Sequence, residues 1–307
     1  MATNDQESLL PSLAFSAGVR EPSLDKNRLP IRRFITLALQ QTDARPLARV
    51  LWWTNVGLTV MYAFLAIVLV FLALFLSKQT LDLYWSPLRW NSGASAWYTA
   101  QRKAGSLRPD FLLMALVALF AIARAAHLIS WTRAYYMSMV MDWGYNTFRW
   151  AMHGMLLGGI IATGAMVMGT RDIFIFVSVW VTYALYTALR LSMEQMNPAE
   201  NGTKNAKYPV NWMPFLLSVL GLLYVVAVHV VFFAIATDDK SAKVPWYAYA
   251  VLAVTVLVHL VDLAVNALYH ATKFLRRFVV VEIVHLVAEA VLVVVIPLVI
   301  VVGFGIA

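Results

Sequence analysis

The sequence lacks cysteine and has few charged residues. Of its 307 residues, 13% are Asp, Glu, Lys or Arg, whereas soluble globular chains carry about 25%. The absence of cysteine excludes disulfide bonds, thiol catalysis and thiolate metal ligands. Low charge combined with 61% hydrophobic residues and a mean hydropathy of +0.71 excludes an ordinary soluble domain. These values indicate an integral, multi-pass membrane protein whose first partner is the lipid bilayer.

Seven apolar runs are long enough to cross the hydrocarbon core, which takes about 20 helical residues. They are residues 50–76, 111–131, 146–169, 172–194, 212–236, 245–270 and 278–306. Leu, Val, Ala and Met dominate the runs, and their length favours helices over strands. The sequence therefore predicts an all-α bundle of seven transmembrane helices over residues 50–307, with a long loop at 77–110 between the first two helices.

Residues 1–49 form a polar tail without the apolar core of a signal peptide. Residues 30–40 fit a basic interfacial helix, with simple positively charged flanking sequence as the alternative. When the tail is placed in the cytoplasm, thirteen Lys and Arg lie on the cytoplasmic side and eight on the other. This bias predicts a cytoplasmic N-terminus, an extracytoplasmic C-terminus and an extracytoplasmic loop 77–110. The formal net charge of +8 thus reflects topology and not nucleic-acid binding.

Ionisable residues at membrane depth are costly, so each is a candidate for function. Those predicted to form an intramembrane polar network are His127, Glu194, His259, Asp262 and Glu282. In the last span, His285 and Glu289 follow Glu282 at spacings of three and four residues, which place all three on one helical face. That face must point into the bundle or into a wet cavity.

Three interpretations of these residues stay open. They form a hydrogen-bonded network that fixes helix packing, a proton or cation path in which histidines act beside carboxylates, or a buried zinc site. For zinc, His285 and Glu289 have a suitable spacing, and His153, His259 and Asp262 are candidates for a third ligand. The sequence shows no catalytic motif. We expect Arg124 to reach the membrane surface with its long side chain in preference to pairing with an internal acid. Gly154 and Gly158 have a spacing that permits close helix contact, within the chain or between two copies.

Five motifs in consecutive spans resemble those of heliorhodopsins, a family of seven-helix, rhodopsin-like membrane proteins. They are Ala125-Ala126-His127-Leu128, Asn146 with Arg149-Trp150, Met193-Glu194 with Asn197, Trp212 with Pro214-Phe215, and Ala264 with Asn266. Each motif alone is weak, but their order and their spread over most of the chain indicate membership of the family. The resemblance implies a rhodopsin-like fold, a homodimer and a sensory or regulatory role more often than pumping.

The chain departs from the family at the chromophore. Heliorhodopsins bind retinal through a lysine that ends a Leu-Ser-x-x-Ala-Lys motif, and the similar stretch here runs from Val284 to Ala288-Glu289. A carboxylate cannot form an imine, which needs a nucleophilic amine. The family's glutamate counter-ion corresponds to Met152 and its neighbouring tyrosine to His153. We therefore expect no covalent retinal and no other cofactor.

These observations lead to three functional hypotheses. The first is a non-catalytic sensory or regulatory bundle that binds a protein partner or an apolar ligand in the former chromophore cavity, lined by His153, His285 and Glu289. The second is proton or cation transport through the intramembrane His, Glu and Asp residues. The third is a zinc-dependent intramembrane hydrolase.

Overall fold

The computed structural model describes residues 46–75, 80–86, 88–91, 96–197, 199–200, 203–204, 210–238, 244–271 and 278–306. Within these ranges, seven helices are long and apolar enough to span a membrane, which confirms the predicted all-α bundle. They are α2 (Pro46–Phe75), α3 (Pro109–Ala126), the composite third span (Thr147–Val167), α7 (Ile173–Met196), α8 (Met213–Asp238), α9 (Trp246–Ala271) and α10 (Phe278–Ile306). The predicted basic helix at 30–40 lies outside the described residues.

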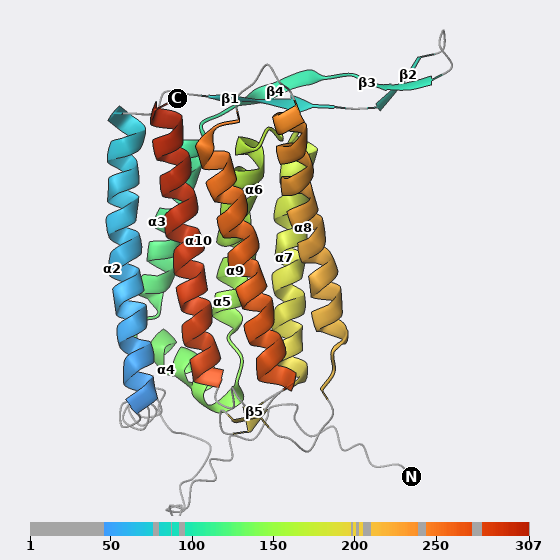
Figure 1. Cartoon of the computed structure of the whole chain (residues 1–307). Coiled ribbons are helices and arrows are strands. Elements are labelled where there is room, and N and C mark those ends of the chain that lie inside the picture. The colour runs from blue at the N-terminus through green and yellow to red at the C-terminus, as the bar shows by residue number, and fades with distance from the viewer. Residues whose placement is uncertain are drawn as a thin grey trace, which may run out of the picture.

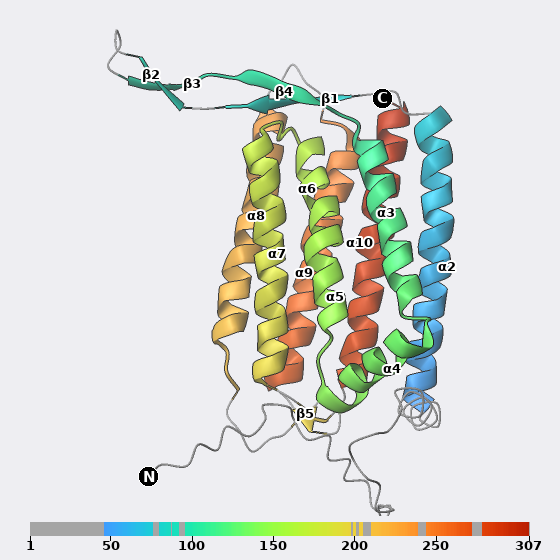
Figure 2. The same ribbon diagram turned by 180° about the vertical axis from the view of Figure 1, so that it is seen from behind.

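Successive spans run in opposite directions (Figures 1 and 2). Helices α2 and α3, α7 and α8, and α9 and α10 pack side by side, and α10 also packs against α2. We call the end of the bundle where α2 and α10 begin the lower end, because Figure 1 draws it at the bottom. The opposite end, where α10 finishes, is the upper end.

The third span lies among the other helices, and 78% of an 18-residue stretch of it is buried. It consists of α5 (Thr147–Met152), a π-helical turn η2 (His153–Leu157) and α6 (Gly158–Val167). Its glycines allow α7 to approach closely. A Cβ atom on Gly154 would lie 2.7 Å from Oγ1 of Thr187, and one on Gly158 would lie 2.9 Å from Cδ1 of Trp180. These two glycines therefore serve packing inside the chain.

The second span is shorter than predicted. Residues 111–131 were expected to be one helix, but α3 ends at Ala126 and the chain turns. A separate helix, α4 (Ser130–Ser138), follows and continues into the π-helical turn η1 (Met139–Trp143) across the lower end (Figure 2). The apolar run misled the prediction because Ile129 and Trp131 are apolar, although each is 60% exposed in the structure.

The loop between the first two spans contains a β-ribbon above the upper end (Figure 1). Strand β1 (Leu81–Trp85) pairs with β4 (Arg102–Leu107), and β2 (Leu88–Asn91) pairs with β3 (Ala96–Thr99), both antiparallel. The backbone N–H of Tyr84 donates to the carbonyl of Arg171 over 2.8 Å, which ties the ribbon to the connection between α6 and α7. A further pair, β5 (Ala199–Glu200) and β6 (Thr203–Lys204), lies between α7 and α8.

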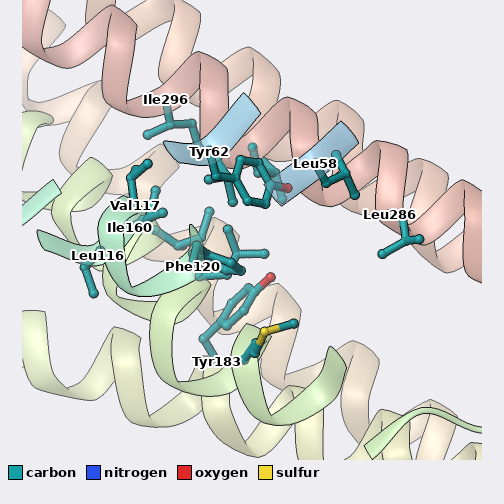
Figure 3. Packing of buried hydrophobic residues seen from close by; sticks show 14 of the residues in the cluster. Leu58, Tyr62, Leu116, Val117, Phe120, Ile160, Tyr183, Leu286 and Ile296 are labelled. Atoms are coloured by element: carbon teal, nitrogen blue, oxygen red, sulfur yellow. The ribbon is translucent and has the colours of Figure 1, made fainter. Parts of the chain in front are cut away.

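Apolar side chains from α2, α3, α6 and α10 fill the bundle. Figure 3 shows Leu58, Val117, Phe120, Ile160 and Ile296 directed toward one another around Tyr62. The buried residues of α10 above Glu289 are all non-polar, namely Leu292, Val293, Ile296, Pro297, Ile300, Val301 and Gly303. The buried polar residues of α10 therefore lie in its lower half.

Candidate functional site

Glu289 lies at the centre of the first buried ion-pair cluster, where α2, α3, η2 and α10 meet. Its Oε1 accepts hydrogen bonds from the Tyr62 hydroxyl over 2.9 Å and from Nε of Arg124 over 3.1 Å. Its Oε2 accepts a second hydrogen bond from Arg124, through a terminal nitrogen, and lies 2.7 Å from Nε2 of His153. The side chains of Arg124 and Glu289 have no exposed surface, so this is a fully desolvated, two-pronged ion pair.

The same arginine extends the cluster toward the lower end. Its remaining terminal nitrogen donates to Oδ1 of Asn55 over 3.1 Å, and the Asn55 amide donates to the Tyr136 hydroxyl over 3.2 Å. This places Arg124 inside the bundle, and the expectation that it reaches the membrane surface was wrong. The physical reason is that Glu289 and Asn55 accept hydrogen bonds from Arg124 and so offset the free-energy cost of burying its charge. An apolar surrounding would offer no such acceptors.

A second cluster surrounds Arg149 on α5. Its two terminal nitrogens bind different carboxylates, those of Glu194 on α7 and Glu282 on α10. Oε1 of Glu282 also accepts hydrogen bonds from the Asn146 amide over 2.6 Å and from the Tyr136 hydroxyl over 3.2 Å. The backbone N–H of Asn146 donates to Glu194 over 3.2 Å, so one short segment before α5 contacts both acids.

A third cluster joins α7, α9 and α10 around Asp262. Its Oδ2 accepts hydrogen bonds from the Tyr186 hydroxyl over 2.6 Å and from Arg190 over 3.0 Å. Its Oδ1 lies 2.6 Å from Nδ1 of His285, whose Nε2 lies 3.0 Å from the Asn266 amide. Each of the three arginines inside the spans is therefore paired with at least one acid from another helix.

Glu282, His285 and Glu289 are buried to 0%, 1% and 1% exposure, so their common face of α10 points into the bundle. Although the three are neighbours on one helix, each has its main partners elsewhere: Arg149, Asp262 and Arg124, respectively. The helix thus presents one group to each of the three clusters. Spacing along α10 predicted the face but not these partners.

A small cavity lies between the first and third clusters. Its volume is about 20 Å³, enough for about one water molecule and far below the roughly 300–1,000 Å³ of pockets that bind drug-sized ligands. Polar groups border much of it, including His153, His259, Asp262, His285 and Glu289. Such a space suits a hydrogen-bonded water and not an extended polyene.

The remaining predicted residues have different surroundings. Met152 packs in the hydrophobic core and does not border the cavity. His127 contacts its own helix through the carbonyl of Ala123 at 3.1 Å, and its ring packs edge-on against Tyr136. His259 lies 2.6 Å from the carbonyl of Thr255 and 3.1 Å from the Tyr183 hydroxyl.

The geometry gives no support to a zinc centre. In the part of the chain that the structure describes, no group of three or more His, Asp or Glu side chains is placed to hold a metal ion. His285 and Glu289, the two ligands with suitable spacing, are directed to different clusters. Of the candidates for a third ligand, His153 contacts Glu289 and Asp262 contacts His285, so they belong to different clusters.

Sequence reasoning missed the arginines as members of the site. Arg124, Arg149 and Arg190 are all at or below 1% exposure and are the largest fully buried side chains. The sequence did hold a signal, because each arginine lies within or at the edge of an apolar run. An arginine at that depth needs a buried acid to compensate its charge. Pairing the three guanidinium groups with Glu194, Asp262, Glu282 and Glu289 would have indicated the clusters.

Comparison with known families agrees with the motifs. The family model for heliorhodopsin matches residues 51–298, which reach from the first span into the last. A comparison with curated proteins found no match.

Proposed function

The chain belongs to the heliorhodopsin family, and from this premise we propose that it is a non-catalytic sensory or regulatory membrane protein that works without covalently bound retinal. The observation that carries the proposal is the buried ion pair between Arg124 and Glu289. Glu289 stands at the position that resembles the family's retinal lysine. Both of its carboxylate oxygens accept hydrogen bonds from the guanidinium of Arg124.

The chemistry of the surrounding residues does not fit retinal. An imine bond needs an amine, and all eight lysines of the chain lie outside the seven spans. The cavity beside Glu289, about 20 Å³, has no room for a polyene. Met152, in place of the family's glutamate counter-ion, leaves no negative charge in the third span for a protonated Schiff base. Lysine and counter-ion are thus replaced together, which avoids an unpaired buried charge.

The regulatory role depends on contacts outside the bundle interior. Because the cavity is too small for an apolar ligand, we favour a protein partner or a second copy of the chain as the binding partner. The family resemblance favours a homodimer, and the basic-residue bias favours a cytoplasmic N-terminus. Light scattering of the purified protein in nanodiscs should give the mass of two chains; the mass of one chain would contradict the dimer.

Transport is the second candidate, supported by the water-sized cavity that His153, His285, Asp262 and Glu289 share. The buried residues of α10 above it are apolar, so a polar route has no continuation along that helix. We therefore expect no proton flux into sealed vesicles under a pH gradient. A flux that Glu289→Gln abolishes would favour transport over the regulatory role.

The proposal is tested by adding all-trans-retinal to the purified protein and recording its absorption spectrum. We expect only the spectrum of free retinal, with no visible band that hydroxylamine bleaches. The matched variant is Glu289→Lys with Arg124→Gln, which restores an amine and removes the competing cation; because the cavity of about 20 Å³ has no room for a polyene, we expect no bleachable band from it either. A hydroxylamine-sensitive band in the unsubstituted protein would contradict the proposal.

A further inference from the structure

The buried charges inside the described spans do not balance. Apart from Asp110, which pairs with Arg108 at the start of α3, three guanidinium groups face four carboxyl groups, so full ionisation would leave one costly, uncompensated negative charge at membrane depth. The groups are Arg124, Arg149 and Arg190 against Glu194, Asp262, Glu282 and Glu289. One positive charge is missing, and a bound proton is the simplest group that supplies it.

Two of the carboxylates have a guanidinium of their own. Glu289 receives two hydrogen bonds from Arg124, and Asp262 receives one from Arg190 and one from Tyr186. Neither needs a further proton, because each pair is already neutral. The excess negative charge therefore belongs to the second cluster, the one around Arg149.

His285, His153 and His127 do not supply the missing charge. The Asn266 amide nitrogen donates to the backbone carbonyl of Asp262 over 3.3 Å, which fixes the orientation of the amide. The same nitrogen donates to Nε2 of His285, so that ring is neutral and carries its proton on Nδ1, facing Asp262. A charged His153 would make the Glu289 cluster positive and leave the Arg149 cluster negative, so two sites would be unbalanced. A charged His127 would place a second cation beside Arg124. Its Nε2–H would also be a buried donor without a partner among the described residues.

Arg149 divides one positive charge between two acids. Glu194 and Glu282 each receive a single guanidinium N–H, whereas Glu289 receives two from Arg124. Next to this cluster, the Tyr269 ring packs against Phe278, whose ring lies 5.8 Å from the guanidinium of Arg149, and the Tyr269 hydroxyl has no hydrogen-bond partner among the described residues.

We propose that Glu194 and Glu282 together hold one proton, so that Arg149 faces one carboxylate and one neutral carboxylic acid. The proton comes from water at the lower end of the bundle: a carboxylate takes it from hydronium, and water is released. The cluster is thus a proton-binding site that joins α5, α7 and α10. Loss of the proton would leave two carboxylates on one guanidinium and would push α7 and α10 apart at that end.

Infrared spectroscopy in an ester-free detergent tests the proposal through the C=O stretch of a protonated carboxylic acid. We expect this band in the unsubstituted protein at neutral pH, with a downward shift in D₂O and its loss in alkali. Either Glu194→Gln or Glu282→Gln should abolish it, since the remaining glutamate then pairs one to one with Arg149 and ionises. Both variants keep Arg149 paired, so both should fold.

The matched control is Asp82→Asn, which removes a carboxylate from the β-ribbon and should leave the band unchanged. Absence of the band from the unsubstituted protein overturns the proposal without any variant. A band that survives either glutamine substitution in a protein of unchanged circular dichroism overturns it as well, because the proton would then lie on a group outside the pair.

Discussion

Breaking the Arg124–Glu289 pair from one side should destabilise the protein far more than removing both partners. Glu289→Gln leaves the guanidinium of Arg124, which has no exposed surface, without its counter-charge. An uncompensated buried charge costs about 3–5 kcal/mol, and arginine cannot escape by losing a proton. We expect the free energy of unfolding to fall by that amount.

Arg124→Met should cost less, although it removes the other half of the same pair. Glu289 keeps the Tyr62 hydroxyl at 2.9 Å and His153 at 2.7 Å, and a carboxyl can bind a proton to become neutral. The loss is then close to that of unsatisfied hydrogen bonds, about 1–3 kcal/mol. The double variant Arg124→Met, Glu289→Gln should be within about 1 kcal/mol of the starting protein or more stable, as apolar replacements of buried ion pairs often are.

The assay is reversible unfolding in bicelles for all four proteins of this double-mutant cycle, with the coupling energy as the readout. The expected coupling exceeds about 2 kcal/mol, in the sense that the second substitution rescues the first. Additive losses, or Glu289→Gln costing less than about 1 kcal/mol, would refute the reasoning because Arg124 would then have another way to compensate its charge.

Two further predictions concern packing and the β-ribbon. Gly154→Ala should lower the free energy of unfolding by about 1–3 kcal/mol, because the new Cβ would lie 2.7 Å from Oγ1 of Thr187. In the control Gly57→Ala the new Cβ has no atom within 4 Å, so stability should be unchanged or rise by up to about 1 kcal/mol. Thermal unfolding compares the two variants. The hydrogen bond from Lys103 holds the pKa of Asp82 below its ordinary 3.8, so the contact stabilises the folded ribbon above that pH and its contribution is lost as the pH falls further. Amide exchange of β1 should accordingly speed up in acid relative to Asp82→Asn, in which this pH dependence should be absent.

The spans and the family could be predicted because both depend on local sequence. Runs of about 20 apolar residues mark helices directly, and motifs such as Met193-Glu194 and Trp212 with Pro214 lie at fixed places in them. The inward face of α10 followed from the spacing of Glu282, His285 and Glu289 for the same reason.

The partners within the clusters could not be predicted, because they join residues far apart in the chain. Arg124 and Glu289 are separated by 165 positions and Arg149 and Glu282 by 133, and no periodicity relates them. Local spacing suggested contacts among the acids and histidines of α10 itself. A buried charge is stabilised instead by an opposite charge, and here the opposite charges come from other helices. Cross-helix charge balance, and not spacing, determines the arrangement.

The end of α3 was missed for a related reason. Hydropathy continues through Ile129 and Trp131, but the chain turns after Ala126 and exposes both side chains. Membrane proteins place tryptophan at the interface with water, so an apolar residue near a span end does not lengthen the helix. The π-helical turn at His153–Leu157 has no counterpart in the apolar pattern.

Borohydride trapping followed by intact-protein mass spectrometry tests most directly whether the ion pair of Glu289 replaces a retinal linkage. The protein is incubated with retinal, reduced, denatured and weighed. An unchanged mass is the predicted result, since the amine-bearing side chains all lie outside the spans. A stoichiometric gain of one retinyl group would contradict the account, and the modified residue would identify the true attachment site.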